Sequence, residues 1–243
     1  MNKKMGIAVI AAAIGFGLTH VAQAEDDRAW PWSPLGLGIA APAQLPFMSS
    51  DIYGIRVGGV LGLNNDVYGI DCGVTELSTG NFAGIQGAAF TWTEGDAYGI
   101  QAGALANAVR GNALLLQAGS VNVVRGDAAG IQLGGIVNVD GSFAGLQVAG
   151  VMNWNEGTSY GVTIAPINTT IDKFVGWEVA GLVNYSGKFT GFSIAPINVA
   201  YEVTGYQLGI VNACDKMHGV QFGLINLICD SKLPIMVIAN ASF

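Results

Sequence analysis

The stretch AGIQLGGIVN, residues Ala129–Asn138, is followed fifteen residues later by AGLQVAGVMN, residues Ala144–Asn153. Two further copies, TGYQLGIVN and HGVQFGLIN, occupy Thr204–Asn212 and His218–Asn226. Most copies begin with a small or aromatic residue and a glycine. They continue through an apolar residue, a glutamine and another apolar residue, and they end on asparagine. Self-similarity at a fixed period of this length is the signature of a repeat architecture.

The repeat extends through most of the chain. Positions equivalent to Gln132 recur at nearly constant intervals. They are Arg56, Asp71, Gln86, Gln101, Gln117, Gln132, Gln147, Thr163, Glu178, Ser193, Gln207 and Gln221. Gly38 and Met236 complete the set at the two ends, so we expect 14 units.

Residues within a unit alternate in polarity. Ile131 and Leu133 are apolar, whereas Gly130, Gln132 and Gly134 are small or polar. One apolar side and one polar side with a period of two predict a β-strand of about ten residues. The remaining residues, rich in Gly, Asn, Asp and Ser, predict turns. The 36 glycines of the chain also argue against helix.

The N-terminus is typical of a secretory signal peptide. Two lysines precede the apolar run Met5–Leu18, and Ala22-Gln23-Ala24 forms a small-x-small cleavage site. The run is too short to span a bilayer as a helix. We therefore predict a signal peptide at residues 1–24, an N-terminal leader at 25–34 and a single β-repeat domain at 35–243.

The composition indicates that much of the surface does not face water. Only 11% of residues are charged and 51% are hydrophobic, whereas a soluble domain carries about 25% charged residues. Cleavage would remove two lysines and no acidic residue, which changes the net charge from −7 to −9. This balance argues against nucleic acid as a partner. No apolar run long enough for a membrane-spanning helix follows the cleavage site, so insertion into a membrane would require β-strands.

We expect an all-β fold, an antiparallel meander of about 14 strands closed into a transmembrane β-barrel. Tight turns normally pair consecutive strands antiparallel. Membrane-spanning strands have about 9–11 residues, and bacterial barrels have even strand numbers. Closure also removes open sheet edges. The predicted location is the outer membrane of a Gram-negative bacterium, and the predicted partner is outer-membrane lipid.

The C-terminal segment LPIMVIANASF, Leu233–Phe243, supports the barrel hypothesis. Its alternate residues are apolar and it ends on an aromatic residue. A terminal strand of this kind resembles the assembly signal of bacterial outer-membrane barrels. Phe243 is therefore the candidate assembly signal, and the barrel assembly machinery is an expected partner.

The alternative is a β-solenoid with one 15-residue coil per repeat and parallel stacking of strands. The turns are uniformly short, and asparagine recurs at the ends of units, as in stacked Asn ladders. Pro166 and Pro196 occupy positions where other units have glycine, such as Gly135. Proline is largely confined to strand edges and bulges, so this position is either a bulge in a barrel or a corner in a solenoid.

The cysteines distinguish the two folds. Cys214 and Cys229 lie in consecutive turns. A barrel would separate these turns by roughly 25 Å, beyond the reach of a disulfide. A solenoid would stack them at about 5 Å, close enough to bridge.

The repeats resemble those of a family of bacterial surface-repeat proteins exported by Gram-negative bacteria. The resemblance lies in the GLQxGLxN-like rhythm and includes YGIRVGGVLGLNNDVYGIDCGV, which starts at Tyr53, and the apolar C-terminal segment. It covers about Tyr53–Asn226. It implies a surface or outer-membrane location, and it implies no catalytic residue.

The polar side of the repeat is the candidate functional surface, because in a barrel it would line the lumen. The lumen-lining candidates are Arg56, Asp71, Gln86, Gln101, Gln117, Gln132, Gln147, Glu178, Gln207 and Gln221. Small neighbouring residues would leave room for small solutes. Ile136, Val151, Leu182 and Ile225, which we assign to the same side, argue against a wide wet pore.

The predicted function is that of a non-enzymatic outer-membrane barrel, either structural or a passive pore for small solutes. The alternative is a secreted solenoid that binds a ligand or partner through its repetitive face. After the predicted signal peptide, His218 is the single histidine. It leaves no His-rich metal site and no Ser-His-Asp set, so we predict no catalytic residue, no cofactor and no metal site.

Overall fold

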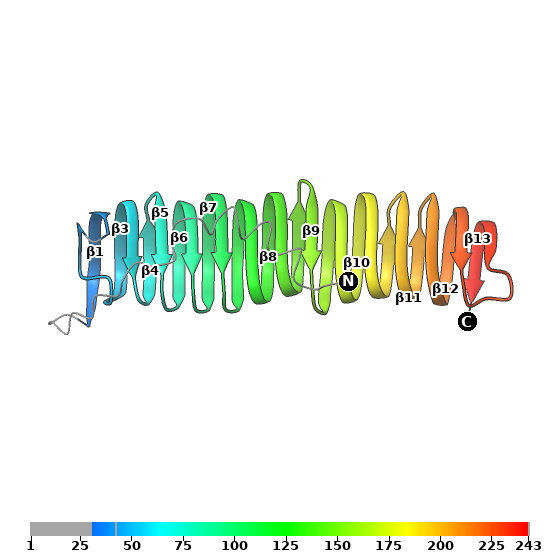
Figure 1. Cartoon of the computed structure of the whole chain (residues 1–243), viewed down its shortest axis with the longest axis horizontal. Helices are drawn as coiled ribbons and strands as arrows, with labels where there is room; N and C mark the ends of the chain where they lie inside the picture. Colours follow the sequence, from blue (N-terminus) through cyan, green and yellow to red (C-terminus); the bar gives the residue numbers. More distant parts are fainter. Residues whose placement is uncertain (1–30, 42, 243) are drawn as a thin grey trace.

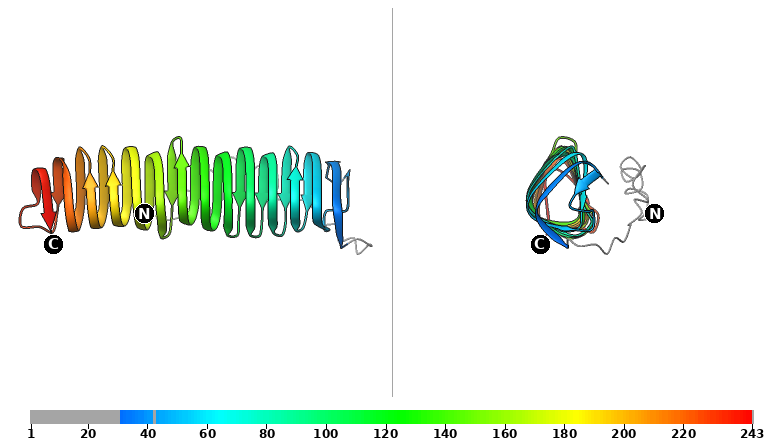
Figure 2. Two further views of the ribbon diagram at one scale, coloured as in Figure 1. Left: turned by 180° about the vertical axis from the view of Figure 1, so that it is seen from behind. Right: turned by 90° about the vertical axis from the view of Figure 1, so that its left-hand side faces the viewer.

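The computed structural model of the chain describes residues 31–41 and 43–242. In this part of the chain every regular element is a β-strand. The chain winds into coils that stack along one long axis from β1 to β13 (Figure 1). Seen along that axis, the coils superimpose into one closed outline (Figure 2). The fold is a β-solenoid. The described residues contain no helix long and apolar enough to cross a membrane.

The strands are β1 (Trp32–Ala40), β2 (Ala43–Leu45), β3 (Asp51–Asn64), β4 (Val67–Cys72), β5 (Thr75–Ser78), β6 (Phe82–Thr93), β7 (Ala97–Val109), β8 (Ala113–Ala149), β9 (Met152–Asn155), β10 (Ser159–Ile194), β11 (Ile197–Leu208), β12 (Val211–Ile228) and β13 (Ile235–Ser242). From β3 to β13 successive strands advance along the rod, whereas at the N-terminal end β1 lies between β2 and β3, and β5 pairs with β3 and β6. β8 and β10 each continue through more than one coil. The end pairs β1–β2 and β12–β13 are antiparallel, whereas the coils between them pair in parallel.

The predicted barrel of about 14 antiparallel strands is wrong, and the solenoid alternative is correct. Tyr53 of β3 pairs with Tyr68 of β4, and Ile197 of β11 pairs with Val211 of β12, both in parallel. In both pairs the partner lies one repeat further along the chain. Each repeat therefore makes one full coil, and the next repeat lies beside it in register. The predictions of transmembrane strands and of a porin-like pore depended on the barrel, so they are wrong as well.

The predicted domain limits are only partly within the described residues. The signal peptide at 1–24, the leader as far as residue 30 and Phe243 lie outside them. Trp32, Ser33 and Pro34, which we assigned to the leader, already belong to β1. The repeat domain thus begins a few residues earlier than the repeat pattern indicated.

The coil corner lies at the Gly/Pro position that was ambiguous in the sequence. Gly135 and Ile136 are both exposed, as are Gly150 and Val151, so the alternation of inward and outward residues shifts by one there. Pro196 occupies the equivalent position in β10–β11, and its carbonyl accepts hydrogen bonds from the next coil. Proline is tolerated because the chain turns at this point.

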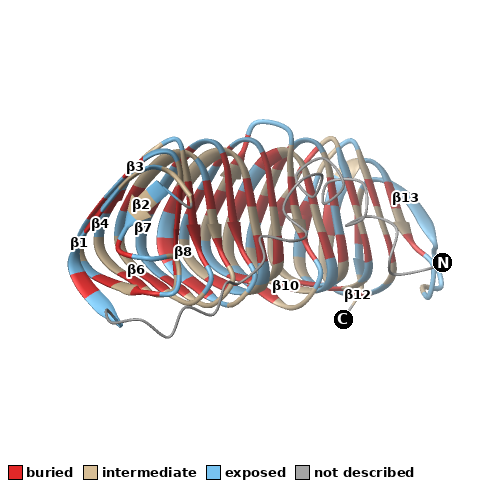
Figure 3. Cartoon of the chain, turned by 60° about the vertical axis from the view of Figure 1, so that its left-hand side comes forward, coloured by how far each residue is buried: buried red, intermediate tan, exposed pale blue. Residues whose placement is uncertain are grey.

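The apolar core is a narrow row along one inner edge of the rod. Buried residues recur at the same places in successive coils (Figure 3). The row consists of two clusters of buried side chains, which include Ile52, Val67, Phe82, Ala97, Ala113, Ala128 and Phe143, then Phe174, Phe189, Val203 and Met217. The rest of the interior is largely polar.

A glycine beside this row limits how closely the coils can stack. Gly145 has φ 136°, and a Cβ atom added to it would overlap the carbonyl oxygen of Gly130 in the preceding coil. L-residues with side chains rarely adopt this φ. The glycine of the repeat is therefore required both by its own backbone and by the neighbouring coil.

We expect Gly145→Ala to destabilise the solenoid by at least about 1–3 kcal/mol, the usual magnitude for a side chain held in a disfavoured backbone region. Gly181→Ala is the matched control, because its added Cβ would make an ordinary contact of 3.6 Å with Pro166 Cα. The urea midpoint of unfolding, followed by far-UV circular dichroism, should fall clearly for Gly145→Ala only. Equal midpoints for the two variants would contradict the stacking argument.

Candidate binding surface

The predicted lumen-lining residues lie inside the solenoid. Their side chains are buried between the two faces of each coil. This holds for Arg56, Asp71, Gln86, Gln101, Gln117, Gln132, Gln147, Glu178, Gln207 and Gln221. They fill the interior of a rod and line no barrel lumen.

The inward glutamines form a hydrogen-bonded ladder along the rod. Gln147 Nε2 donates to Gln132 Oε1 at 2.9 Å, and Gln101 Nε2 donates to Gln86 Oε1 at 2.9 Å. Gln86 Nε2 in turn donates to Asp71 Oδ2 at 2.6 Å. Because buried polar groups need partners, these side chains stabilise the stack and are not free to bind a solute.

A second ladder follows the asparagine that ends each repeat. Asn153 Nδ2 donates to Asn168 Oδ1 at 3.0 Å and to the carbonyl oxygen of Ile164 at 3.2 Å. One amide group therefore donates both to the side chain of the next asparagine and to a backbone carbonyl oxygen near the corner of the next coil. The same pair of bonds is made by Asn107, Asn122, Asn138, Asn168, Asn184, Asn198 and Asn212.

Arg56 holds a buried acidic pair at the N-terminal end of the ladder. Its Nε and Nη2 donate to the two Asp71 oxygens at 2.7 and 2.6 Å, and its Nε lies 3.2 Å from Glu76 Oε2. Burial, and then the nearby Asp71 carboxylate, raise the pKa of Glu76 to about 8, against the opposing effect of Arg56. Arg56 and Asp71, which occupy equivalent positions on neighbouring coils, thus form an ion pair.

Two further carboxyl groups are buried in the middle of the rod. Ser186 Oγ donates to Glu178 Oε1 at 2.7 Å, and burial raises the pKa of Glu178 to about 8. Asp140 accepts from Gln132 at 2.7 Å and from Gln147 at 2.5 Å, yet burial still raises its pKa well above the usual range. Desolvation disfavours the charged form of a carboxyl group, so each is stabilised in its neutral form.

The two C-terminal cysteines lie on adjacent coils without forming a disulfide. Cys229 N donates to the carbonyl oxygen of Cys214 at 3.0 Å, so their backbones are neighbours, as the solenoid alternative predicted. Cys214 is buried and Cys229 is exposed, and both are free thiols. Burial raises the pKa of the Cys214 thiol to about 12. The two side chains therefore point to different sides of the coil wall.

No metal site is found among residues 31–41 and 43–242, where no group of three His, Cys, Asp or Glu side chains is placed to hold an ion. His218 pairs in register with Thr204 of the preceding coil, as expected for a residue at a repeat position.

The outer surface of the rod is unusually apolar. The residues on either side of the inward glutamine row point outward, as the alternation predicted. Large exposed side chains of these two rows include Ile55, Val57, Ile70, Ile85, Ile100, Leu116, Ile131, Leu133, Ile164, Trp177, Tyr206, Leu208 and Phe222. Contiguous exposed apolar surface on a protein marks an interaction site.

The coil corner adds a row of aliphatic side chains, which we call the aliphatic rim. Val151 N donates to the carbonyl oxygen of Ile136, and Ile167 N donates to that of Val151, so these three residues lie on successive coils. Ala89 and Ser120 interrupt the row nearer the N-terminal end. The rim consists of Val60, Val74, Leu105, Ile136, Val151, Ile167, Leu182, Ile197, Ile210 and Ile225. Ile136, Val151 and Leu182 are 51%, 50% and 56% exposed.

The assignment of Ile136, Val151, Leu182 and Ile225 to the inward side is therefore wrong. The corner shifts the alternation by one residue, which turns these side chains outward. The sequence signal for this outward turn is the recurring pair of Gly or Pro followed by an aliphatic residue. The prediction missed it because it continued the period-two alternation through the corner.

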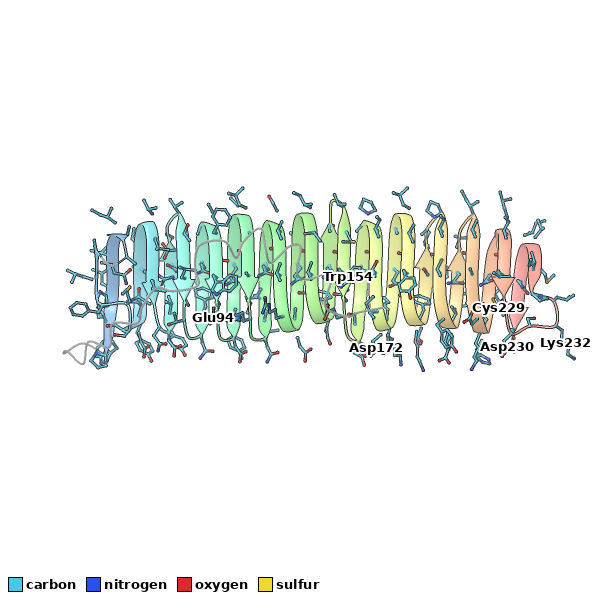
Figure 4. All side chains as sticks on the ribbon, viewed as in Figure 1. Glu94, Trp154, Asp172, Cys229, Asp230 and Lys232 are labelled. Carbon is cyan, nitrogen blue, oxygen red and sulfur yellow. The ribbon has the colours of Figure 1, made fainter. Side chains whose placement is uncertain are left out.

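Charged residues occupy the opposite edge of the coil, which we call the charged rim. It is separated from the aliphatic rim by a strand segment on either side. It comprises Asp51, Asp66, Glu94, Asp96, Arg110, Arg125, Asp127, Glu156, Asp172, Lys173, Lys188, Glu202, Asp215, Lys216 and Asp230. Asp172 and Asp230 lie along the lower edge of the rod in Figure 4. Pairs such as Lys188–Glu202, at 3.0 Å, link neighbouring coils there.

Comparisons with protein-family models, with curated proteins and with solved structures find no match to this chain. The tandem repeat is confirmed by the coils themselves, because each coil contains one repeat. The resemblance to bacterial surface-repeat proteins stays a prediction, as does the role of Phe243.

The buried Glu178 should make stability fall as pH rises. Its folded pKa of about 8 lies above the unfolded value of 4.5, so the folded state binds the extra proton between these values. The stabilisation is complete below pH 4.5 and is lost as pH rises towards 8, by at most roughly 5 kcal/mol. Glu178→Gln should remove this contribution, leaving those of Glu76 and Asp140.

The thermal unfolding midpoint measured at pH 5 and at pH 8.5 tests this expectation. The wild type should lose more stability between the two than Glu178→Gln does. Glu156→Gln, the same change at an exposed position of the charged rim, should keep the wild-type pH dependence. A pH profile that Glu178→Gln leaves unchanged would show that this carboxyl group is not held neutral.

Proposed function

We propose that this chain is a non-catalytic, exported binding rod that attaches to an apolar surface through the outward side chains of its repeats. One observation carries the proposal. Along the described rod, large aliphatic and aromatic side chains stay exposed coil after coil, while the exposed charges gather at one edge. Burial of such surface away from water is the main favourable term in association.

The arrangement of polar groups supports a binding role over catalysis. The ladder residues use their donors and acceptors on one another, and the buried carboxyl groups are closed off from solvent. On the charged rim, acidic side chains bond to the backbone or to basic residues of neighbouring coils. Asp66 and Asp96 accept from backbone N–H groups of the next coil, and Glu94 and Glu202 pair with Arg110 and Lys188. An active site instead gathers an acid, a base or a nucleophile in one accessible pocket.

Export is the part of the proposal that rests on the sequence. The predicted signal peptide and the resemblance to bacterial surface-repeat proteins favour a location at the cell surface or beyond it. The small number of charges agrees with a rod whose outer faces are covered in use. The proposed function needs neither cofactor nor metal.

Retention on an octyl-substituted resin tests the binding surface. The triple variant Ile136→Ser, Val151→Ser, Leu182→Ser removes three half-exposed aliphatic side chains. It should elute at clearly higher salt than the wild type in a decreasing salt gradient, because adsorption falls with apolar area. The control, Arg125→Ser, Asp127→Ser, Glu156→Ser, alters three exposed residues of the charged rim and should elute as the wild type does.

Far-UV circular dichroism should show all three proteins folded, since every substituted side chain points to solvent. Equal retention of the wild type and the aliphatic variant would overturn the assignment of binding to this surface.

A further inference from the structure

We propose that the surface bound by the rod is lipid, and that the aliphatic rim is the part that enters it. This inference rests on the proposed binding function and names its partner. From Ile136 to Ile225 the rim presents an Ile, Leu or Val side chain in every coil. Elements that lie in a membrane interface bury an apolar side to a depth of about 5–10 Å and keep their charges in water.

The distribution of charge matches that geometry. Within residues 31–41 and 43–242, every Asp, Glu, Lys and Arg that is not buried lies on the charged rim, or, for Lys232, in the loop before β13 (Figure 4). The segment Phe174–Ala180 separates Lys173 of the charged rim from the corner at Gly181. At about 3.3 Å per residue it spans roughly 20 Å. A rod that inserts its aliphatic rim therefore keeps all these charges outside the lipid.

Four tyrosines lie where the headgroups would be. Tyr53, Tyr68, Tyr98 and Tyr160 occupy equivalent outward positions at the start of the glutamine strand, next to the charged rim. Tyr68 Oη donates to Asp66 at 3.2 Å, and Tyr98 Oη donates to Asp96 at 3.3 Å. An aromatic ring on the apolar side with its hydroxyl towards water is the arrangement favoured at membrane interfaces.

The shape of the rim favours lipid over a second copy of the chain. The rim is a coil corner between two strand faces that both expose large side chains, such as Ile131 on the glutamine side and Tyr185 and Tyr201 on the asparagine side. Two such corners make little contact when they meet. A face-to-face dimer would cover one face and leave the rim and the other face in water. Lipid is fluid and can follow the corner and both flanks at once.

Flotation with vesicles of neutral phosphatidylcholine tests the inference. The wild type should float with the vesicles. The partition coefficient of the variant Ile136→Ser, Val151→Ser, Leu182→Ser should be lower by a factor of about ten or more, because the variant loses apolar area at the contact. The control Arg125→Ser, Asp127→Ser, Glu156→Ser should partition as the wild type does. All variants carry the same residues 1–30, so their difference reports the rim alone.

The salt dependence gives a second readout. Raising the salt from about 0.05 M to about 0.5 M should leave flotation nearly unchanged, since salt screens charge contacts and not apolar ones. A fluorophore sensitive to polarity, placed at Leu182→Cys in a background with Cys72→Ser and Cys229→Ser, should shift to the blue on adding vesicles. The same fluorophore at Glu156→Cys should not shift.

The outcomes separate the two proposals. Retention on the octyl resin without flotation would overturn lipid as the partner and leave the binding rod in place. If the wild type neither stays on the octyl resin nor floats with vesicles, both the binding rod and its lipid partner are overturned. Flotation that the aliphatic variant shares with the wild type would overturn the rim as the contact. Concentration-dependent dimers that this variant dissociates, in the absence of vesicles, would assign the rim to a second copy instead.

Discussion

The solenoid depends on parallel, in-register stacking of equivalent residues from one coil to the next. This register places an asparagine above an asparagine, so that Asn153 bonds to Asn168 and also to the backbone of the next coil. A shift by one residue would turn every inward amide outward and bring apolar side chains inside. The repeat length is thus held by hydrogen bonds between side chains as well as by the backbone ladder. The glycine at Gly145 allows the coils to approach closely enough for both.

Stacking of inward polar side chains inverts the usual distribution of polarity in a folded domain. The interior carries a row of glutamine and a row of asparagine besides its narrow apolar core, whereas most isoleucines and leucines of the coils remain at least partly exposed. Such an interior is stable only when its polar groups have partners, because an unpaired buried group loses its water without compensation. The ladders provide these partners by repetition. Some outward rings stack from coil to coil, as Tyr53 and Tyr68 do, but the exposed aliphatic side chains form no hydrogen bonds that would hold the coils together. Their exposure requires an explanation in binding.

The repeat, the all-β class and the inward position of Gln132 could be predicted from the sequence, because period-two alternation is a local property. The choice between barrel and solenoid could not be settled in that way. Both use the same alternation, and they differ only in whether a strand pairs with its sequence neighbour or with the same strand one repeat later. The corner at Gly135 decides this. Since a corner looks like a strand interrupted by glycine, the outward turn of Ile136 was also missed. A recurring position that accepts only Gly or Pro was the available signal.

The interruption of the glutamine ladder shows how the inside and outside of the rod compensate each other. Thr163, Glu178 and Ser193 replace glutamine in three consecutive coils, so the bonds between glutamines lapse there while the asparagine ladder continues. In the same region Phe174 and Phe189 stack inside the rod with ring centroids 6.2 Å apart. Outside it, Trp177, Phe192 and Tyr206 form a continuous row with centroids 5.8 and 5.7 Å apart. Aromatic stacking can help to hold the register where the glutamine amides are missing, because each ring contacts its equivalent in the next coil. The outward row then serves the stack as well as the surface, so in these coils the binding face is also structural.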